Sequence, residues 1–445
     1  MYYEGVRSLL LFSAAAATLA YACGGGSGAS DGGEDAAPDV VTQQDAGIDV
    51  VEAAAPDVGI DNYIAPLPVW QVTPLFDYVG GHLLTSVKVI TVSFSSDDAA
   101  LITRVQELDD TITQSAWWTA ATSEYCELPS GPCIGPGTPA GHVVLTETAP
   151  TSLIDNDDGT GSTVVSFIQD HITSGLFPPP DDQTIYVIYF PSGTSIQYDG
   201  DHSCSSFGAY HYSATFNLPD GGTQEGSYAI EPRCSGEPYI TFAASHELIE
   251  AATDARPGKL QGWVMEDLAW QYYGDEVGDI CDHYWSFEST VTDSMYIDTI
   301  DGGAPFQVQR GWSNLSALAG HDPCVIPPSN PYFNTAPGQS QQNVYLSVGE
   351  STTVQFTGFS DGPMPDWTIS AIDMGSHYGS GNVLTLSLDT TTMNSGQVAN
   401  LTITLNSEPT ITDVAYVIDS KGTYTPDGGS PITAEHQWGA NVYLK

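Results

Sequence analysis

Positive charge is the scarcest property of this sequence. Only 9 of its 445 residues are Lys or Arg, against 55 Asp and Glu, so the formal net charge at pH 7 is −46. A protein that binds a nucleic-acid backbone needs a basic surface to neutralise phosphates. We therefore exclude nucleic acid as a partner. Most of the acidic side chains are expected to form a solvated exterior, and we expect a monomer.

The sequence also lacks an apolar run long enough to span a membrane near its start. The run from Ser8 to Ala22 follows Arg7 and has the length of a signal-peptide core. Residues 1–22 are therefore expected to be a signal peptide. The run ends in the order Leu-Ala-Tyr-Ala-Cys at Cys23, which resembles a bacterial lipobox. We expect Cys23 to carry a lipid; ordinary signal cleavage at the Ala-Tyr-Ala sequence is the alternative.

Core-forming residues are missing from the next segment, 23–62, which is rich in Gly, Ala, Asp and Pro. Such a composition cannot bury enough apolar surface to fold, so it is expected to be a disordered stalk. Together with a lipid on Cys23, it indicates an exported lipoprotein of a bacterial cell envelope, at the outer membrane or cell surface. Secretion is the alternative. Membrane contact is expected through the lipid anchor only.

No C-x-x-C pair is present, which argues against a thiolate zinc site. An even set of six cysteines remains after Cys23, and disulfides are the expected state in an exported chain. Six cysteines allow fifteen pairings. Their order along the chain suggests the pairs Cys126–Cys133, Cys204–Cys234 and Cys281–Cys324.

Residues 63–326 alternate strand and helix patterns, which predicts an α+β domain. β-branched apolar runs predict strands, and apolar residues at helical spacing predict helices. The expected strands are 86–94, 142–146, 183–190, 210–212 and 227–230, and the expected helices are 97–122, 162–176 and the segment around 245–254.

Helix patterns are absent from residues 327–445, where short strands are separated by turns. This spacing is typical of an immunoglobulin-like β-sandwich, joined to the first domain by a Pro-rich linker at 326–331. The segment has no cysteine and no cluster of reactive side chains. We expect it to act as a spacer or a binding domain.

The strongest chemical signal is the sequence His-Glu-Leu-Ile-Glu at residues 246–250. In a helix, His246 and Glu250 share one face, and two side chains at this spacing can bind one metal ion. Glu247 would take the place of the general base in an H-E-x-x-H zinc helix. Here the second histidine of that motif is a glutamate. The alternative is that these are polar helix residues with a structural role.

A catalytic zinc needs three protein ligands and a water. The candidates for the third ligand are Glu276, Asp279, His283 and His211. We favour Glu276 or Asp279, because the chain returns there beside Cys281. Asp254 would lie about 12 Å along the helix axis from His246, so we expect it to serve at the helix end.

Five short segments stand in a fixed order within residues 85–325. They are Trp117-Trp118-Thr119 with Tyr125, Tyr210-His211, Tyr228-Ala229-Ile230, the stretch 245–254, and Gly278-Asp279-Ile280-Cys281. Taken together, they resemble the bacterial relatives of the plant phosphate-induced (exordium-like) cell-wall proteins. Those relatives often carry S-H-E-L-x-E-A-x-T-D-P followed by G-E-I-G-D-x-C, and the likeness covers roughly residues 85–325.

The resemblance implies a secreted, zincin-like domain: a mixed sheet with an active-site helix that carries an H-E-x-x-E motif and metallopeptidase chemistry. Two positions depart from the family pattern. Ala255 stands where the relatives often have proline, and Asp275-Glu276-Val277 replaces G-E-I. Neither change removes one of the candidate ligands.

The resulting prediction is a surface-anchored zinc metallopeptidase that hydrolyses extracellular protein or peptide. Zinc would activate a water, and Glu247 would transfer that water's proton to the leaving amine. Calcium or manganese becomes conceivable as carboxylate ligands are added. The alternative is a non-catalytic envelope or adhesion lipoprotein that contacts a cell-surface polymer and has a structural metal site or none.

Overall fold

The computed structural model describes residues 75–157, 159–271, 274–281, 295–298, 306–325, 331–376, 380–410, 413–425 and 429–445. The expected signal peptide at 1–22, Cys23, the stalk at 23–62 and His283 lie outside these residues. In the part of the chain that is described, no helix combines the length and apolar character needed to cross a membrane.

A five-stranded sheet organises the first part of the described chain, in the order β3-β2-β5-β9-β8. The first four strands are parallel, and β8 runs antiparallel to β9 at one edge. All five strands expected from the sequence belong to this sheet. Their bounds are β2 Lys88–Phe94, β3 Thr138–Leu145, β5 Thr184–Phe190, β8 Tyr210–Asn217 and β9 Thr223–Pro232.

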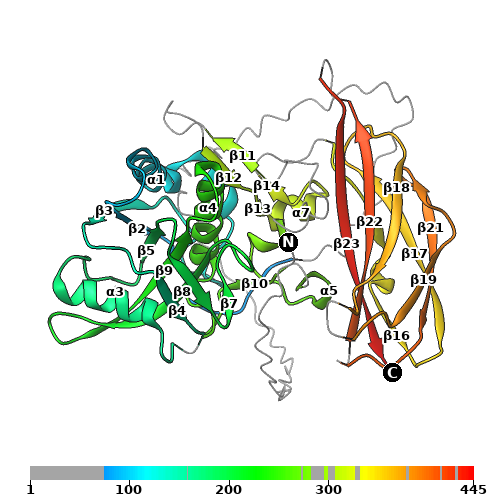
Figure 1. Ribbon diagram of the computed structural model, residues 1–445. Coiled ribbons are helices and arrows are strands. Elements are labelled where there is room, and N and C mark those ends of the chain that lie inside the picture. Colours follow the sequence, from blue (N-terminus) through cyan, green and yellow to red (C-terminus); the bar gives the residue numbers. More distant parts are fainter. Residues whose placement is uncertain are drawn as a thin grey trace, which may run out of the picture. The chain divides into compact units, whose positions relative to one another are not determined.

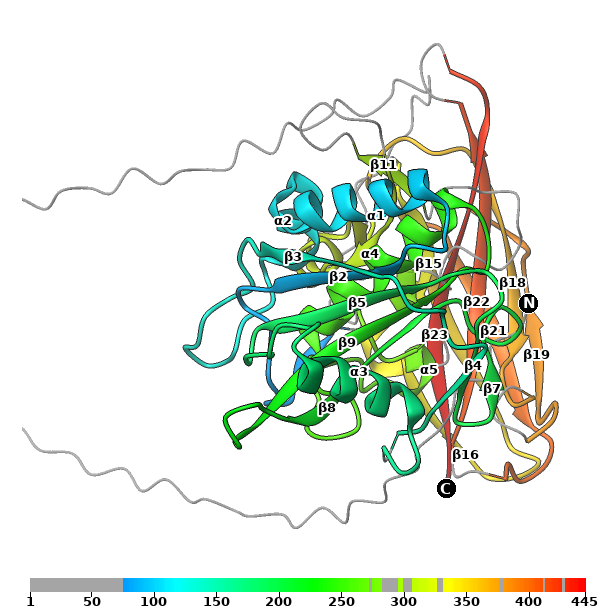
Figure 2. The same cartoon turned by 60° about the vertical axis from the view of Figure 1, so that its left-hand side comes forward.

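Helices cover both faces of the sheet. Successive side chains of a strand point to opposite faces, so neighbouring residues of one strand meet different helices. In β5, Ile185 and Val187 belong to the same buried cluster as side chains of helices α1 (Ala99–Thr111) and α4 (Glu237–Thr253), whereas Tyr186 and Ile188 belong to the cluster that includes side chains of α3 (Thr163–Ser174). All seven residues of β5 are buried, as expected for a strand covered on both faces. Figure 2 shows α1 above the strands and α3 below them.

The expected helix at 97–122 is interrupted, which corrects the sequence prediction. It consists of α1 Ala99–Thr111, the 3₁₀ turn η2 Ile112–Gln114 and α2 Ala116–Thr122. The break lies at Ser115, whose Oγ accepts a hydrogen bond from Trp118 N at 3.0 Å and so caps a new helix. The expected helix at 162–176 is present as α3 Thr163–Ser174.

Helix α4, Glu237–Thr253, carries the H-E-x-x-E motif. It packs on β8, β9 and the strand β12 (Phe306–Gln309), as Figure 1 shows. Leu248 and Ile249 are fully buried and supply the core contacts that their positions predict. The helix ends at Asp254, before Pro257, and Asp254 Oδ1 accepts a hydrogen bond from Gly262 N at 3.1 Å. Asp254 is thus a helix-end residue.

Short elements and three disulfides complete this part of the fold. The disulfides are Cys126–Cys133, Cys204–Cys234 and Cys281–Cys324, which confirms the pairing suggested by chain order. The short elements are β1 Asp77–Tyr78, β4 Ser152–Asp155, β6 Ser195–Tyr198, β7 Asp201–His202, β10 Trp263–Val264, α5 Leu268–Gln271, β11 Met295–Asp298, β12 Phe306–Gln309, β13 Gly311–Trp312, α7 Asn314–Ala319 and β14 Cys324–Val325.

The C-terminal part is a β-sandwich of two sheets, as the sequence predicts. One sheet has the order β15-β17-β21-β19 and the other β16-β23-β22-β18-β20. Alternating apolar residues such as Phe356, Leu401 and Tyr416 fill the space between them. The elements are β15 Phe333–Pro337, η5 Gln339–Gln341, β16 Asn343–Leu346, β17 Ser351–Ser360, β18 Trp367–Asp373, β19 Leu384–Leu388, β20 Thr392–Met393, β21 Val398–Leu405, β22 Asp413–Tyr424 and β23 Ile432–Leu444.

Candidate metal centre

Helix α4 brings two potential ligands together, as the four-residue spacing predicts. His246 Nε2 lies 3.0 Å from Glu250 Oε2. Glu250 is buried, with 3 % of its side chain exposed, whereas His246 is 16 % exposed. Glu247 Oε1 lies 4.0 Å from His246 Nε2, on the buried side of the same helix. The helix therefore presents one imidazole and two carboxylates to a common region.

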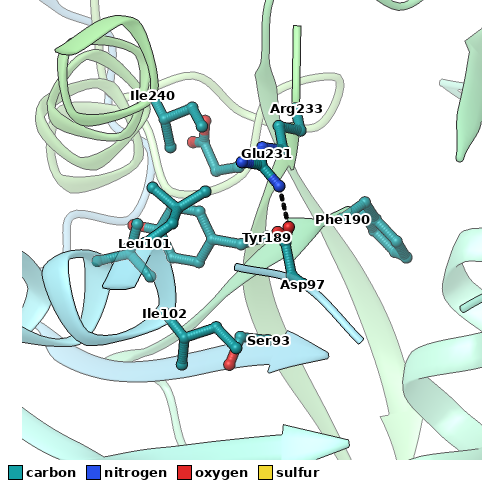
Figure 3. Close-up of a pocket in the computed structure, with 10 residues that line it drawn as sticks. Ser93, Asp97, Leu101, Ile102, Tyr189, Phe190, Glu231, Arg233 and Ile240 are labelled. Carbon is teal, nitrogen blue, oxygen red and sulfur yellow. Dashed lines mark hydrogen bonds and ion pairs between the residues drawn. The ribbon is translucent and has the colours of Figure 1, made fainter. Parts of the chain in front are cut away.

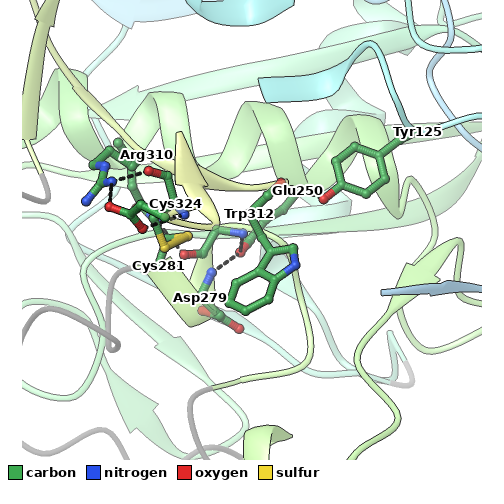
Figure 4. Close-up of a disulfide and its surroundings, with 10 residues drawn as sticks. Tyr125, Glu250, Asp279, Cys281, Arg310, Trp312 and Cys324 are labelled. Atoms are coloured by element: carbon green, nitrogen blue, oxygen red, sulfur yellow. Dashed lines mark hydrogen bonds and ion pairs between the residues drawn. A yellow bond between two sulfur atoms is a disulfide. The ribbon is translucent and has the colours of Figure 1, made fainter. Parts of the chain in front are cut away.

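The segment that returns beside Cys281 completes this arrangement. The backbone N–H groups of Gly278 and Asp279 donate hydrogen bonds of 3.1 and 2.9 Å to Glu250 Oε1. Asp279 Oδ1 lies 3.7 Å from His246 Nε2. Figure 4 shows Asp279 beside Glu250, close to the disulfide that fixes the segment. The disulfide thus anchors a third candidate ligand next to the helix.

Glycine at position 278 is needed for this close approach. A Cβ added to Gly278 would lie 2.7 Å from Glu250 Oε1 and 3.0 Å from His246 Nδ1. A side chain there would push the return segment away from α4. Only glycine, which has no side chain, fits at this position of the Gly-Asp-Ile-Cys sequence beside the candidate ligands.

Three donor atoms have the spacing expected around one ion. One potential ligand atom from each of His246, Glu250 and Asp279 lies within 4.8 Å of the other two. Ligand atoms about 2.1 Å from a tetrahedral zinc are about 3.4 Å apart. The distances of 3.0 and 3.7 Å from His246 Nε2 lie on either side of that value. Asp279, one of the two favoured candidates, is the one that joins His246 and Glu250.

His211 of β8 approaches the same helix from the edge of the sheet. Its Nδ1 lies 3.4 Å from Glu247 Oε2 and 3.8 Å from Glu250 Oε2. Its Nε2 lies 3.4 Å from Glu276 Oε1. Glu276 therefore lies on the His211 side of the cluster, apart from the donor set of His246.

Gln309, at the end of β12, was missed by the sequence analysis. Its Oε1 lies 2.5 Å from His246 Nδ1, and its Nε2 donates to the carbonyl of Gly278 at 2.5 Å. Its backbone N–H donates to Ser245 Oγ, and its carbonyl accepts from Trp117 Nε1. Because an amide oxygen only accepts, His246 Nδ1 carries the hydrogen and Nε2 faces the carboxylates. Local sequence patterns do not indicate a contact between two residues that are 63 positions apart, which is why Gln309 was not predicted.

Replacing Gln309 with Met should lower the affinity for zinc by about 10- to 100-fold, since the side chain that orients His246 is lost at similar volume. Gln309→Glu keeps an acceptor for His246 Nδ1 but loses the donor to the Gly278 carbonyl, so its affinity should fall less than that of the Met variant. Zinc titration against a competing chelator measures both. Equal affinity of the Met variant and the wild type would show that Gln309 does not position His246.

Negative charge exceeds positive charge throughout this cluster. Every Lys and Arg in the described part of the chain pairs with a carboxylate outside it. Burial raises the pKa of Glu276 and of Asp279 well above the ordinary carboxyl range. Burial alone would lower the pKa of His246, but Glu250 and Glu247 raise it well above its usual value. The site thus favours cations, whether protons or metal ions.

The cluster reaches the surface through His246 and Asp279, whose side chains are 16 % and 29 % exposed. A separate pocket lies at the carboxyl ends of β2, β5 and β9, and Figure 3 shows the Asp97–Arg233 ion pair beside it. Its lining contains none of the candidate ligands. It is formed by Ser93, Asp97, Leu101, Ile102, Val105, Tyr189, Phe190, Glu231, Arg233 and Ile240.

Comparisons with known proteins give structural neighbours with very low overall similarity. No protein-family model matches the chain, and no curated protein matches it. A Bacteroides ovatus GH5 xyloglucanase in complex with a XXXG heptasaccharide is similar over 25 % of this chain, at 19 % identity and a TM-score of 0.13, and the chain spans 19 % of its length.

Two further neighbours are immunoglobulin-like domains. The BIgI domain of beta protein from S. agalactiae bound to CEACAM1 is 12 % identical over 26 % of this chain and 96 % of that domain, with a TM-score of 0.14. The swine CD8aa homodimer is 11 % identical over 25 % of this chain and 97 % of its own, with a TM-score of 0.14. Similarity at this level assigns neither a family nor an activity to the chain.

Proposed function

We propose that the protein is a divalent-metal-dependent peptidase of the H-E-x-x-E type, with zinc as its ion. The observation that carries this proposal is the convergence of one ligand atom each from His246, Glu250 and Asp279 within 4.8 Å, with Glu247 beside them. One imidazole and two carboxylates suit zinc or manganese, and calcium is less favoured because it takes six or more oxygen ligands.

Zinc in such a site supplies a Lewis acid and a water that is nucleophilic at neutral pH. Glu247 is placed to accept a proton from that water and to pass it to the leaving amine. Glu247 Oε1 lies 4.0 Å from His246 Nε2, while its Oε2 lies 3.4 Å from His211 Nδ1, so the two carboxylate oxygens face different histidines. Gln309 keeps His246 in the tautomer that a ligand requires.

The zincin-like fold and the exordium-like family remain part of this proposal. A mixed sheet with an antiparallel edge strand beside the motif-bearing helix supports them. Their support also includes the motif order in the sequence, from Trp117-Trp118 to Gly278-Asp279-Ile280-Cys281. The proposed substrate is extracellular protein or peptide, reached from a lipid anchor at Cys23 in the bacterial cell envelope.

A structural role is the second candidate, and one observation favours it. Glu250 Oε1 accepts hydrogen bonds from the backbone N–H groups of Gly278 and Asp279, so this carboxylate joins the return segment to α4. In a non-catalytic envelope or adhesion module, the same bonds would serve stability alone, with a structural ion or none.

Metal analysis combined with cleavage of casein or peptides tests the proposal. The purified chain is expected to hold zinc in at least stoichiometric amount after dialysis and to cleave the substrate. Chelation should abolish cleavage, and added zinc should restore it. Purified chain without bound metal would overturn the proposal. Bound metal with no cleavage of any substrate would favour the structural role.

A further inference from the structure

His211 has around it the same kinds of groups as His246. Its Nδ1 faces two carboxylates, with 3.4 Å to Glu247 Oε2 and 3.8 Å to Glu250 Oε2. One potential ligand atom from each of His211, Glu247 and Glu250 lies within 4.8 Å of the other two. Both distances are close to the separation of about 3.4 Å between ligands of one tetrahedral ion. The second donor set therefore passes the same geometric test as the first.

The orientation of the His211 ring suits a metal ligand. Its Nε2 lies 3.1 Å from the backbone carbonyl oxygen of Asp254, which can only accept a hydrogen bond. In the neutral ring the hydrogen then sits on Nε2, and the lone pair of Nδ1 points toward Glu247 and Glu250. A ligand histidine commonly donates its other N–H to a carbonyl in this way. Gln309 Oε1 does the same for His246 Nδ1.

Carboxylates crowd the two histidine rings. Glu247, Glu250, Glu276 and Asp279 each have an oxygen within 4.0 Å of a ring nitrogen of His211 or His246. Glu276 Oε1 is buried, has no hydrogen-bond partner among the described residues, and lies 3.4 Å from His211 Nε2. Uncompensated buried carboxylates are costly.

We propose that a second divalent cation binds between His211, Glu247 and Glu250, so that the centre holds two ions that share Glu250. This inference rests on the proposed function, because the first ion is the one held by His246, Glu250 and Asp279. Glu247 contacts the second ion through Oε2 and keeps Oε1 toward His246 for proton transfer. Centres with two ions occur in hydrolases, where both ions stabilise the transition state.

The number of ions per chain tests this inference without depending on activity. Purified full-length chain is stripped with a chelator, reloaded with zinc, dialysed to remove loosely bound surface ions, and analysed by mass spectrometry of the metal. We expect two ions per chain for the wild type and one for His211→Gln. His142→Gln is the matched control, since His142 pairs with Asp110 at the surface, and it should retain two.

Glu247→Gln provides a second variant in case His211→Gln does not fold, and it should also hold one ion. One ion in the wild type would overturn the second site and leave the proposed function intact. Two ions in both His211→Gln and Glu247→Gln would place the second ion elsewhere and overturn the inference. No ion in the wild type would overturn the proposed function as well.

Discussion

Replacing Glu247 with Gln is expected to lower the rate of peptide hydrolysis by about 10²- to 10⁴-fold, the usual contribution of a general base. The amide is nearly the same size as the carboxylate but cannot accept the proton of the attacking water. Glu247 is buried beside His246, so no bulk water replaces it as a base. The ion that we propose at His246, Glu250 and Asp279 should stay bound, because Glu247 is outside that donor set.

The measurement is kcat with zinc-loaded protein on a quenched fluorescent peptide, together with zinc content. Glu408→Gln changes an exposed glutamate of the sandwich in the same way and should cleave at the wild-type rate. Wild-type turnover by Glu247→Gln would remove Glu247 from the mechanism. Loss of both turnover and all bound zinc would instead make Glu247 a ligand of the first ion.

Replacing Asp109 with Asn is expected to stabilise the protein at pH 8 by up to about 4 kcal/mol. Burial within α1 raises the pKa of Asp109 from its ordinary 3.8 to about 7. Its Oδ2 has no hydrogen-bond partner among the described residues, and its Oδ1 accepts from Tyr189 Oη at 2.9 Å. Asn keeps that acceptor and removes the charge that would be buried at pH 8.

The sign of the pH dependence follows from the two pKa values. The unfolded chain loses the Asp109 proton near pH 4, whereas the folded chain holds it until about pH 7. The free energy of unfolding therefore falls as pH rises through this window, by about 1.4 kcal/mol per unit. Asp109→Asn avoids this loss, so its advantage should be largest at pH 8 and shrink toward pH 4.

Urea unfolding of wild type and variant at pH 5 and pH 8 measures this effect. Asp110→Asn is the matched control, since Asp110 is the next residue and is 40 % exposed, and it should shift stability by less than about 1 kcal/mol. An advantage of Asp109→Asn that is the same at both pH values would show that the buried charge is not its cause.

Local patterns in the sequence predicted most of the secondary structure. Apolar residues in a β-branched run predicted the buried strand β5, and the four-residue spacing predicted that His246 and Glu250 meet. Both depend on periodicity along a single element, which the sequence shows directly. The break at Ser115 was not predicted, because helical spacing continues across it while the Ser115 side chain caps α2.

The sequence reduced the candidates for the third metal ligand beside α4 to a few residues but did not identify one of them. Glu276 and Asp279 were equally favoured as the third ligand, since both precede Cys281. Packing separates them: Asp279 lies against His246, whereas Glu276 lies against His211. Sequence spacing cannot distinguish between two candidate ligands that are three residues apart in the return segment. The choice between them depends on the close contact of Gly278 with Glu250.

The sequence by itself determined an acidic chain with three disulfides, an α+β part, a β-sandwich, and a helix with an imidazole and two carboxylates. The tertiary structure decided what surrounds that helix. Gln309 reaches His246 from 63 residues away, and His211 reaches Glu247 from 36 residues away. Such contacts arise because β12 and β8 both pack on α4, and no local pattern in the chain records that packing.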